Sequence, residues 1–455
     1  MSHDVDRVWS VSEHLDSILG QLTPLEPIEL QLLDAQGCVL VEDVTVPVAL
    51  PPFENSSMDG YAVRVADTEA ATEEHPAVLE VVGDVAAGSG ELPTVGPGQA
   101  ARIMTGAPLP PGAEGIAPVE WTDGGTGGGP ATTMAAHSTD PSGAAGEVRV
   151  HRPVRQGEFV RERGSDVAAG ELALAAGTIL GPAQIGLLAA IGRGTVKVRP
   201  RPRVVVVSTG SELMQPGEEL AAGRIYDSNS FALTAAARAA GAIAYRVGAV
   251  ADEVETLRAT IEDQLIRADI IVTSGGVSVG AYDVVKEALS SISDGSEDVA
   301  VNTADGSDLG QGDTPAPGGF VDFRKLAMQP GKPQGFGRIG PDRTPLLALP
   351  GNPVSAYVSF ELFVRPAIRT LMGAGSVHRE VVRATCVTAI ERSPEGRRQF
   401  LRGHYNRAAG TVTPVGGSGS HLVRALAHAD ALIVVPEADT SVAAGANVEV
   451  VVLEG

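Results

Sequence analysis

Cysteine is scarce in this chain of 455 residues, which contains only Cys38 and Cys386. The two lie too far apart in the sequence for the clustered spacing of a structural zinc site, and so few cysteines are typical of a reducing compartment. A chain of this length buries enough apolar surface to fold without disulfides or a structural metal ion. Its length predicts about three domains.

Positive charge is also scarce, because 34 lysines and arginines stand against 56 aspartates and glutamates, giving a formal net charge of −22. Proteins that bind nucleic acid or anionic membranes present a basic face, so this balance disfavours both classes. No apolar run reaches the roughly 18 residues that cross a bilayer. The opening MSHDVDRVWS lacks the basic start and apolar core of a secretory signal. We therefore expect a cytoplasmic protein that has neither nucleic acid nor a membrane as its partner.

The first half of the chain contains one helical pattern and many short β patterns. Apolar residues in 8–22 recur at helical spacing, which predicts an amphipathic helix. Residues 28–50 predict either short strands or a helix and a strand. Between 53 and 152, short β-branched runs alternate with glycine and proline turns, which predicts a β-rich domain. Within it, residues 122–146 have almost no large apolar side chains, so we expect a mobile surface loop.

Strand and helix patterns alternate between residues 181 and 375. The run VVVVSTG at 204–210 is typical of a strand buried on both faces. Further strand patterns lie at 242–250, 269–274 and 345–349, and helix patterns at 228–240, 252–267, near 283–290 and from Asn352 and Pro353 onward. This alternation predicts a doubly wound parallel α/β sheet.

Two further segments complete the organisation. Residues 292–319 are rich in glycine, serine and aspartate, which indicates a second mobile insertion. From residue 380 the pattern returns to short strands over about 75 residues, near the lower limit of an independent domain. We expect a small C-terminal β-barrel or sandwich there.

Three strand ends of the predicted α/β domain carry small or polar residues. Open α/β sheets bind ligands outside the carboxyl ends of their strands, and exposed N–H groups at helix starts favour phosphate. One glycine turn after a strand is usually only a turn, but three at one edge favour a binding site. The residues are Ser208, Thr209 and Gly210, then Ser274, Gly275, Gly276 and Ser278, and finally Pro350, Gly351, Asn352 and Ser355.

Charged residues accompany these turns. Asp227 and Asp283 each precede a predicted helix, so helix capping alone explains either of them. Together with Glu212, which follows the first turn, they favour a hard divalent cation such as Mg²⁺. Lys325 and Lys332 are either solvated surface lysines or the counter-charge for an anionic ligand.

Asp59 and Thr105 stand in two earlier segments that are dense in polar and turn-forming residues. These segments are 51–64 and 101–120. Asp59 precedes Gly60, so a plain hairpin turn is an alternative explanation for it.

Eight motifs in register resemble the MoeA/gephyrin E-domain family of molybdopterin molybdenumtransferases. They are FENSSMDGYAV, RIMTGAPLPPGAE, RERGSDV, STGSEL, IYDSNS, SGGVSVGAYD, KLAMQPGKPQGFG and LPGNPVSA. The resemblance covers nearly the whole chain except the two low-complexity segments. It implies an elongated homodimer whose subunit has four parts. These parts are a linker or dimerisation domain of 8–50 plus 153–180, a β-rich domain of 51–152, a molybdopterin-binding domain of 181–375 and a β-barrel of 376–455.

The resemblance also implies a reaction and its partners. Molybdate and adenylylated molybdopterin yield molybdenum cofactor and AMP, with Mg²⁺ as the divalent cation. Molybdopterin adenylyltransferase and apo-molybdoenzymes are further implied partners. A related adenylyltransferase family shares the central fold, but it carries a GGTG-type turn instead of GGVSVG and lacks the flanking domains.

The family's active site lies in a cleft between two subunits. By position, Glu212, Asp227, Asp283, Lys325 and the three sheet-edge turns come from one subunit, and Asp59 and Thr105 come from the other. Asp166, Arg397 and Ser420 also match functional positions, although the adjacent Arg398 matches as well as Arg397 does. Gln329 stands where some members carry a lysine, so one positive charge is missing.

Two other functions fit the same resemblance. A gephyrin-type scaffold that clusters membrane receptors need not keep Glu212, Asp227, Asp283 and Asp59 together, and this chain has all four. A tungstate-preferring paralogue is the other alternative, since the two oxyanions are almost equal in size.

Overall fold

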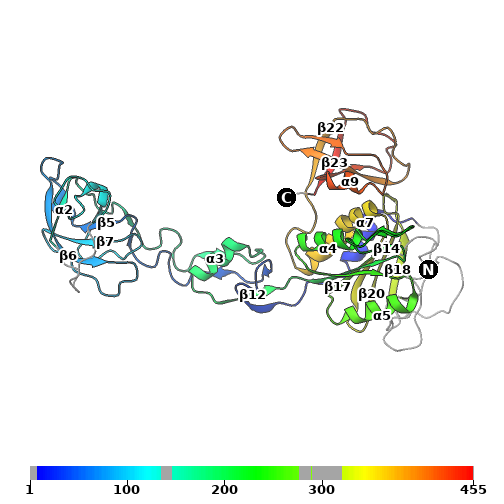
Figure 1. Cartoon of the computed structure of the whole chain (residues 1–455), viewed down its shortest axis with the longest axis horizontal. Coiled ribbons are helices and arrows are strands. Elements are labelled where there is room, and N and C mark those ends of the chain that lie inside the picture. Colours follow the sequence, from blue (N-terminus) through cyan, green and yellow to red (C-terminus); the bar gives the residue numbers. More distant parts are fainter. Residues whose placement is uncertain (1–7, 135–145, 276–287, 289–319, 454–455) are drawn as a thin grey trace. The chain divides into compact units, whose positions relative to one another are not determined.

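The computed structural model describes residues 8–134, 146–275, 288 and 320–453 (Figure 1). The chain divides into two compact units, which are treated separately below. The larger unit consists of Met1–Leu30, Ala35–Val41 and Lys197–Gly455, and the smaller unit of Gln31–Asp34 and Glu42–Val196. None of the helices in the described ranges has the length and apolarity needed to span a bilayer.

A six-stranded sheet forms the centre of the larger unit. Its order is β16 (Ile243–Val250), β13 (Arg203–Thr209), β17 (Ile270–Ser274), β21 (Thr344–Leu349), β20 (Pro333–Ile339) and β18 (Phe320–Lys325). The first four strands are parallel, as predicted. The pairings of β20 with β21 and with β18 are antiparallel, so the sheet is mixed rather than wholly parallel. Because two reversals restore the direction, β18 runs the same way as β21.

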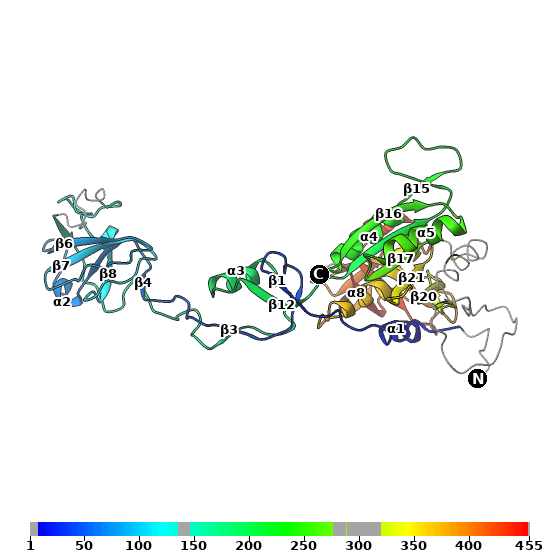
Figure 2. The same cartoon turned by 90° about the horizontal axis from the view of Figure 1, so that it is seen from below.

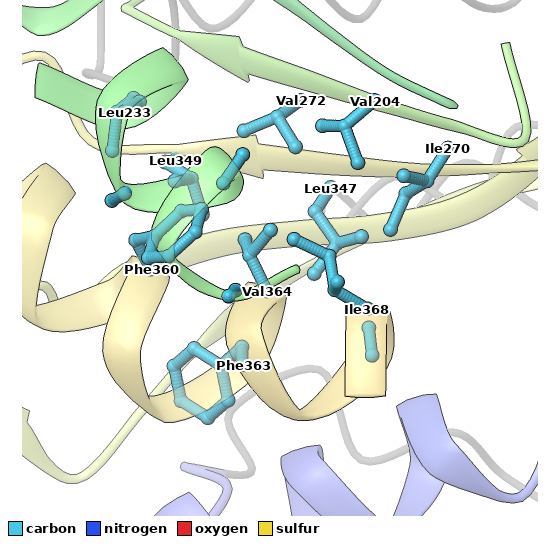
Figure 3. Close-up of a cluster of buried hydrophobic side chains, with 14 of the residues drawn as sticks. Val204, Leu233, Ile270, Val272, Leu347, Leu349, Phe360, Phe363, Val364 and Ile368 are labelled. Carbon is cyan, nitrogen blue, oxygen red and sulfur yellow. The ribbon is translucent and has the colours of Figure 1, made fainter. Parts of the chain in front are cut away.

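Helices cover both faces of this sheet. One face packs against α4 (Asn229–Ala239), α7 (Pro353–Ser359), the π-helical turn Phe360–Val364, α8 (Arg365–Leu371) and α1 (Val11–Leu19), and the other against α5 (Val254–Leu265). Alternate valines of β13 point into the two cores, with Val204 on the α4 side and Val205 on the α5 side. Figure 3 shows the first core, where Val204 and Leu347 face Phe360 and Ile368.

Helix α1 lies beside α8 in this core, although the two helices are far apart in the sequence (Figure 2). Its start is fixed by a capping box, since the Ser10 hydroxyl accepts from the Glu13 N–H at 3.1 Å and the Glu13 carboxylate accepts from the Ser10 N–H at 2.8 Å. Ile18 of α1 is fully buried there. The structure thus separates α1 from residues 153–180, which the sequence analysis grouped with it.

The C-terminal strands of the larger unit form the predicted β-barrel. Five strands close in the order β23, β24, β22, β26, β25 and back to β23, and the short strand β19 adds to β23 in parallel. Their bounds are β19 (Met328–Gln329), β22 (Val381–Cys386), β23 (Arg398–Asn406), β24 (Thr411–Pro414), β25 (Ala431–Val435) and β26 (Asn447–Val452), with helix α9 at Val423–Ala427. Phe400 and Leu432 on the outside of the barrel belong to the core that contains α7 and α8.

The smaller unit is β-rich, as predicted. Its sheet has the order β8 (Gly115–Pro118), β5 (Gly60–Val63), β7 (Gln99–Ile103), β6 (Ala77–Val85) and β9 (Glu147–Val150). The helix α2 (Val65–Thr68) and the 3-10 turn Val119–Trp121 accompany it. The segment 122–146 begins with a turn in which Asp123 is buried. The Asp123 carboxylate holds this turn, since it accepts from the N–H groups of Gly125, Gly127 and Arg149 at 2.9–3.0 Å.

Short strands and one helix make up the remaining elements. Their bounds and pairings are β1 (Ile28–Gln31), β12 (Thr195–Arg199) and β2 (Val39–Leu40) in one sheet, β3 (Val44–Thr45) with β11 (Leu172–Leu174), β4 (Asn55–Ser56) with β10 (Val160–Arg161), β14 (Leu213–Met214) with β15 (Ile225–Tyr226), and helix α3 (Pro182–Ala190). The expected insertion 292–319 and the expected helix near 283–290 lie outside the described residues, except for Ala288, which is helical and buried.

Candidate active site at the sheet edge

The three turns that the sequence singled out lie together at the carboxyl edge of the parallel strands. A Cβ on Gly275, after β17, would lie 2.3 Å from the Thr209 carbonyl oxygen at the end of β13. A Cβ on Gly351, after β21, would lie 3.4 Å from the Cα of Gly275. Gly275 also has a φ of +103°, which favours glycine. Small residues therefore allow three backbone turns to meet, as the strand pattern predicted.

Asn229, the first residue of α4, ties two of these turns to each other. Its Nδ2 donates to the Ser274 hydroxyl at 2.8 Å and to the Gly351 carbonyl at 2.7 Å. The Ser274 hydroxyl in turn donates to the Pro350 carbonyl at 3.3 Å. Asn229 lies in the motif IYDSNS, and no sequence pattern assigned it a role. Its amide holds the edge in one shape.

Two carboxylates gather beside the first turn, and one of them was missed from the sequence. The Glu212 side chain folds over Gly210, since a Cβ on Gly210 would lie 2.7 Å from Glu212 Oε2. Asp252, just after β16, has its pKa raised by burial and, secondly, by the charge of Glu212, while hydrogen bonds from Ser211 and Thr209 oppose the shift. A usable signal existed, because Asp252 follows the fourth parallel strand at the same edge.

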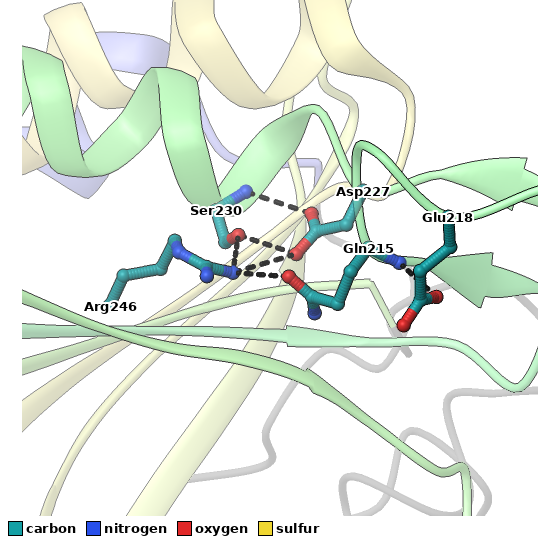
Figure 4. A network of polar contacts seen from close by, with 5 residues as sticks. All are labelled: Gln215, Glu218, Asp227, Ser230 and Arg246. Carbon is teal, nitrogen blue, oxygen red and sulfur yellow. Dashed lines mark hydrogen bonds and ion pairs between the residues drawn. The ribbon is translucent and has the colours of Figure 1, made fainter.

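Asp227 has a different environment from that predicted. Its buried carboxylate accepts from the Ser230 N–H at 3.0 Å and from the Ser230 hydroxyl, so it caps the first turn of α4 (Figure 4). Arg246 lies 4.0 Å from the same carboxylate and also donates to Gln215 Oε1 at 3.1 Å. Both oxygens of Asp227 therefore have protein partners, and Asp252 is the carboxylate beside Glu212.

The metal set predicted from the sequence is only partly described. Of this set, Asp283 lies outside the described residues, as do Gly276 and Ser278 of the second turn. Within the described ranges, no three His, Cys, Asp or Glu side chains lie close enough to hold a metal ion together. Glu212 and Asp252 are two carboxylates at this edge, and Asp252 is half-buried beside Glu212. Oxygen donors of this kind fit a hard divalent cation.

Both predicted lysines belong to the same edge of the sheet. Lys325 ends β18, which runs in the direction of β21, and Lys332 directly precedes β20, whose first residue pairs with Lys325. Two strand spacings of about 4.8 Å separate β18 from β21, or roughly 10 Å. Lys325 is exposed and Lys332 is half-buried. Both lysines thus lie at the edge that carries the three turns, and their contact with an anionic ligand stays a prediction.

The barrel reaches the start of α7. The Ser420 carbonyl accepts from the Val354 N–H at 3.0 Å, so the loop that carries Ser420 meets the α7 start with its exposed Asn352 and buried Ser355. The guanidinium of Arg402, which is 1% exposed, donates to the Gly417 carbonyl of the same loop. Burial lowers the pKa of Arg402. No sequence pattern singled out this buried arginine.

The two candidate arginines at the start of β23 differ in their partners. Arg398 Nε lies 3.1 Å from Glu437 Oε1, and the Arg398 N–H donates to the Ala327 carbonyl at 2.9 Å. Arg397 is half-buried and forms no ion pair with any residue that the structure describes. A role for Arg397 in ligand binding stays a prediction.

The smaller unit holds the remaining predicted residues. Asp59 Oδ1 accepts from both the N–H and the hydroxyl of Thr105, at 2.7 and 2.8 Å, so the two motifs that carry them are joined. Both residues are exposed. Asp166 is exposed as well, and its N–H donates to the Leu50 carbonyl at 3.0 Å. Each carboxylate can reach a ligand from solvent.

Comparisons with known families match successive parts of this chain to models of one protein type. Three family models match, described as the MoeA N-terminal region (domain I and II) over residues 9–192, a probable molybdopterin binding domain over 205–304 and 309–370, and the MoeA C-terminal region (domain IV) over 387–453.

Individual proteins match over nearly their whole length. Molybdopterin molybdenumtransferase 2 of Mycobacterium tuberculosis is 44% identical over 441 residues, covering 97% of this chain and 98% of the relative. Molybdopterin molybdenumtransferase 1 of the same organism is 36% identical over 466 residues, covering 98% and 99%. The crystal structure of a molybdopterin biosynthesis MoeA protein from Pyrococcus horikoshii is 30% identical, with a TM-score of 0.68 and coverage of 99% and 100%.

Proposed function

Because the chain belongs to the MoeA family, which it matches from its N-terminal region through to its C-terminal domain, we propose that it is a molybdopterin molybdenumtransferase. It takes molybdenum from molybdate into adenylylated molybdopterin and releases AMP. The observation that carries this proposal is the convergence of Thr209, Gly275 and Gly351 at one sheet edge in a chain that is 44% identical to a relative of that name.

The sheet edge supplies the binding groups for the phosphates of the substrate. The edge lies next to the start of α7, where the partial positive charge of a helix N-terminus favours an anion. Lys325, Lys332 and Arg397 add full positive charges in a chain that is otherwise acidic. Such donors, fixed before the reaction, stabilise the negative charge that develops on oxygen atoms during transfer.

Glu212 and Asp252 are the residues that would hold the divalent cation, with Asp283 as a further ligand. Mg²⁺ fits this set because it prefers carboxylates together with substrate phosphates. When bound, the cation would neutralise charge on the anhydride that links AMP to molybdopterin. Burial and, secondly, the charge of Glu212 raise the pKa of Asp252, and a cation bound here would oppose both effects.

A homodimer is part of the proposal, and exposed apolar side chains support it. Leu33 is 81% exposed and Leu172 is 55% exposed. The helix α3, PAQIGLLAA, has Gln184 as its one polar side chain, yet only Leu188 among its residues is buried. A helix of this composition is normally covered, and a second copy of the chain would cover it.

The exposed Asp59 and Thr105 would then act at the sheet edge of the second copy, as the family resemblance implies, and the exposed Asp166 is a further candidate for a functional residue. Ser420 would contribute from the barrel of the copy that owns the edge. The proposed place of work is the cytoplasm, where molybdopterin adenylyltransferase would deliver the substrate and apo-molybdoenzymes would receive the product.

A direct assay tests the proposal. Purified protein is incubated with adenylylated molybdopterin, Mg²⁺ and molybdate, and both AMP release and cofactor formation are followed. AMP release that depends on molybdate supports the transferase, whereas binding without turnover points to a scaffold. A parallel series with tungstate separates the molybdate enzyme from a tungstate-preferring paralogue.

A further inference from the structure

The segment that joins β18 to β20 carries both lysines of the sheet edge. It runs from Lys325 to Lys332 and turns back on itself, so that the Leu326 N–H donates to the Lys332 carbonyl at 2.8 Å. At the start of this segment, the Lys325 carbonyl accepts from the Trp9 N–H at 3.0 Å. The backbone of both lysines is therefore held by hydrogen bonds.

A buried amide lies directly under this turn. Gln334, the second residue of β20, is 1% exposed and lies on the same side of the strand as Phe336 of the main core. Its Nε2 donates to the Gly331 carbonyl at 2.7 Å and to the Ser359 hydroxyl of α7 at 2.6 Å. An amide in an apolar core costs free energy unless it is hydrogen-bonded, and a leucine or methionine would fill this space without that cost.

The turn is pressed closely against these two side chains. A Cβ on Gly331 would lie 2.9 Å from the Ser359 hydroxyl and 3.3 Å from Gln334 Nε2, and the φ of Gly331 is +96°. Ser359 is fully buried. The position of Gly331, and with it that of the next residue Lys332, is therefore set by contact with α7 and β20.

We propose that Gln334 is a positioning residue for the transfer reaction. It contacts no substrate, and it fixes the Gly331 carbonyl so that Lys332 stays at the sheet edge in line with Lys325. The proposal rests on the proposed function, because it assigns Lys332 to the anionic substrate. Catalytic groups must be held to within about 0.5 Å, and a misplacement of about 1 Å lowers a rate up to 100-fold.

The first test replaces Gln334 by methionine, which has a similar volume and no hydrogen-bond donor. The Gln334→Met variant should show kcat/KM for adenylylated molybdopterin lowered about 10- to 100-fold, mainly through KM, with AMP release as the readout. Its melting temperature should stay close to that of the parent, because an apolar side chain suits the surroundings. Ser359→Ala is the matched control, since it removes one acceptor and leaves the bond to Gly331. Its kcat/KM should fall less than threefold.

A double-variant cycle decides between positioning and mere structure. If Gln334 acts through Lys332, then Gln334→Met should add little to the defect of Lys332→Met. Additive losses, or a Gln334→Met variant with unchanged kinetics, would overturn the proposal. Gln334→Asn should lower kcat/KM as much as Gln334→Met does, because the shorter amide cannot reach the Gly331 carbonyl.

A readout without activity separates this proposal from the proposed function. Hydrogen exchange of the peptide that contains Gly331 and Lys332 should quicken in Gln334→Met and stay unchanged in Ser359→Ala. A wild-type protein that releases no AMP would refute the transferase, while the exchange result still reports whether Gln334 holds the turn. Equal exchange in all three proteins would refute the positioning role.

Discussion

The Thr209 carbonyl oxygen and Gly275 lie so close that a Cβ on Gly275 would approach this oxygen to 2.3 Å. Two strand ends thereby touch without any side chain between them, and Gly351 joins them from the third strand end. The proposed phosphate site consists mainly of backbone for this reason, and its shape depends on one missing methyl group.

Gly275→Ala should damage both stability and substrate binding. The added Cβ must displace backbone, and the positive φ is strained for alanine, so we expect a loss of about 1–3 kcal/mol. This corresponds to a fall in melting temperature of roughly 3–10 °C. Gly351→Ala is the control, because its Cβ meets Gly275 at an ordinary 3.4 Å. Equal melting temperatures for the two variants would contradict the close approach.

Binding of adenylylated molybdopterin should depend on Mg²⁺ through Asp252. Calorimetry should show at least about tenfold tighter binding with Mg²⁺, or about 1.4 kcal/mol, in the wild type. Asp252→Asn should lose most of this difference, since it removes a charge beside Glu212. Asp263→Asn changes an exposed carboxylate of α5 and should keep it. A magnesium effect that survives in Asp252→Asn would exclude this residue from the site.

Activity should require two copies of the chain. Asp59→Asn and Asp252→Asn should each be nearly inactive, because each change affects both sites of a homodimer. In an exchanged mixture half of the dimers are mixed, and each mixed dimer has one intact site. AMP release should therefore recover to about a quarter of the wild-type rate by the symmetry of a two-fold dimer. Verified mixed dimers without any recovery would place Asp59 at its own chain's sheet edge.

His14 should make the larger unit sensitive to acid. Burial and, secondly, the nearby Arg324 lower the pKa of His14 from 6.5 to about 3. The folded state therefore takes up fewer protons than the unfolded state below pH 6.5, and stability falls as the pH falls towards 3. Between pH 7 and pH 5 the loss should be about 2 kcal/mol.

Urea unfolding at both pH values measures this effect, with Trp9 fluorescence as the probe in a Trp121→Phe background. His14→Gln should lose about 2 kcal/mol less than the parent over this interval, whatever its stability at pH 7. His378→Gln removes an exposed histidine and should behave like the parent. The same pH dependence in all three proteins would show that His14 is protonated in the folded state.

The strands that the sequence predicted well are those buried on both faces. VVVVSTG could only be a central strand, and β13 spans Arg203–Thr209 accordingly. The strand β20 was missed because PQGFGRI contains a proline and two glycines, which lower strand propensity. The structure explains one of these glycines, since a Cβ on Gly335 would lie 2.8 Å from the Phe323 ring. Contacts between distant segments decide such positions.

The meeting of the three turns at one edge of the sheet was predicted from the sequence, whereas the roles of individual residues there stay predictions. The rule that ligands bind at strand ends was enough to select Thr209, Gly275 and Gly351. The sequence alone does not distinguish an aspartate that binds a ligand from one that caps the following helix, and Asp227 caps α4 in the structure. Asp252 was missed because its partner Glu212 is 40 residues away in number and adjacent only after β13 and β16 pair.

The core of the larger unit has a consequence for how such proteins can be recombined. Phe400, Leu432 and Val434 of the barrel share one core with α7 and α8, and β19 continues the barrel into the turn that carries the lysines. The barrel is therefore no interchangeable module. A chimera that takes its barrel from a distant relative should fold and work only if it also inherits that relative's α7, α8 and lysine turn.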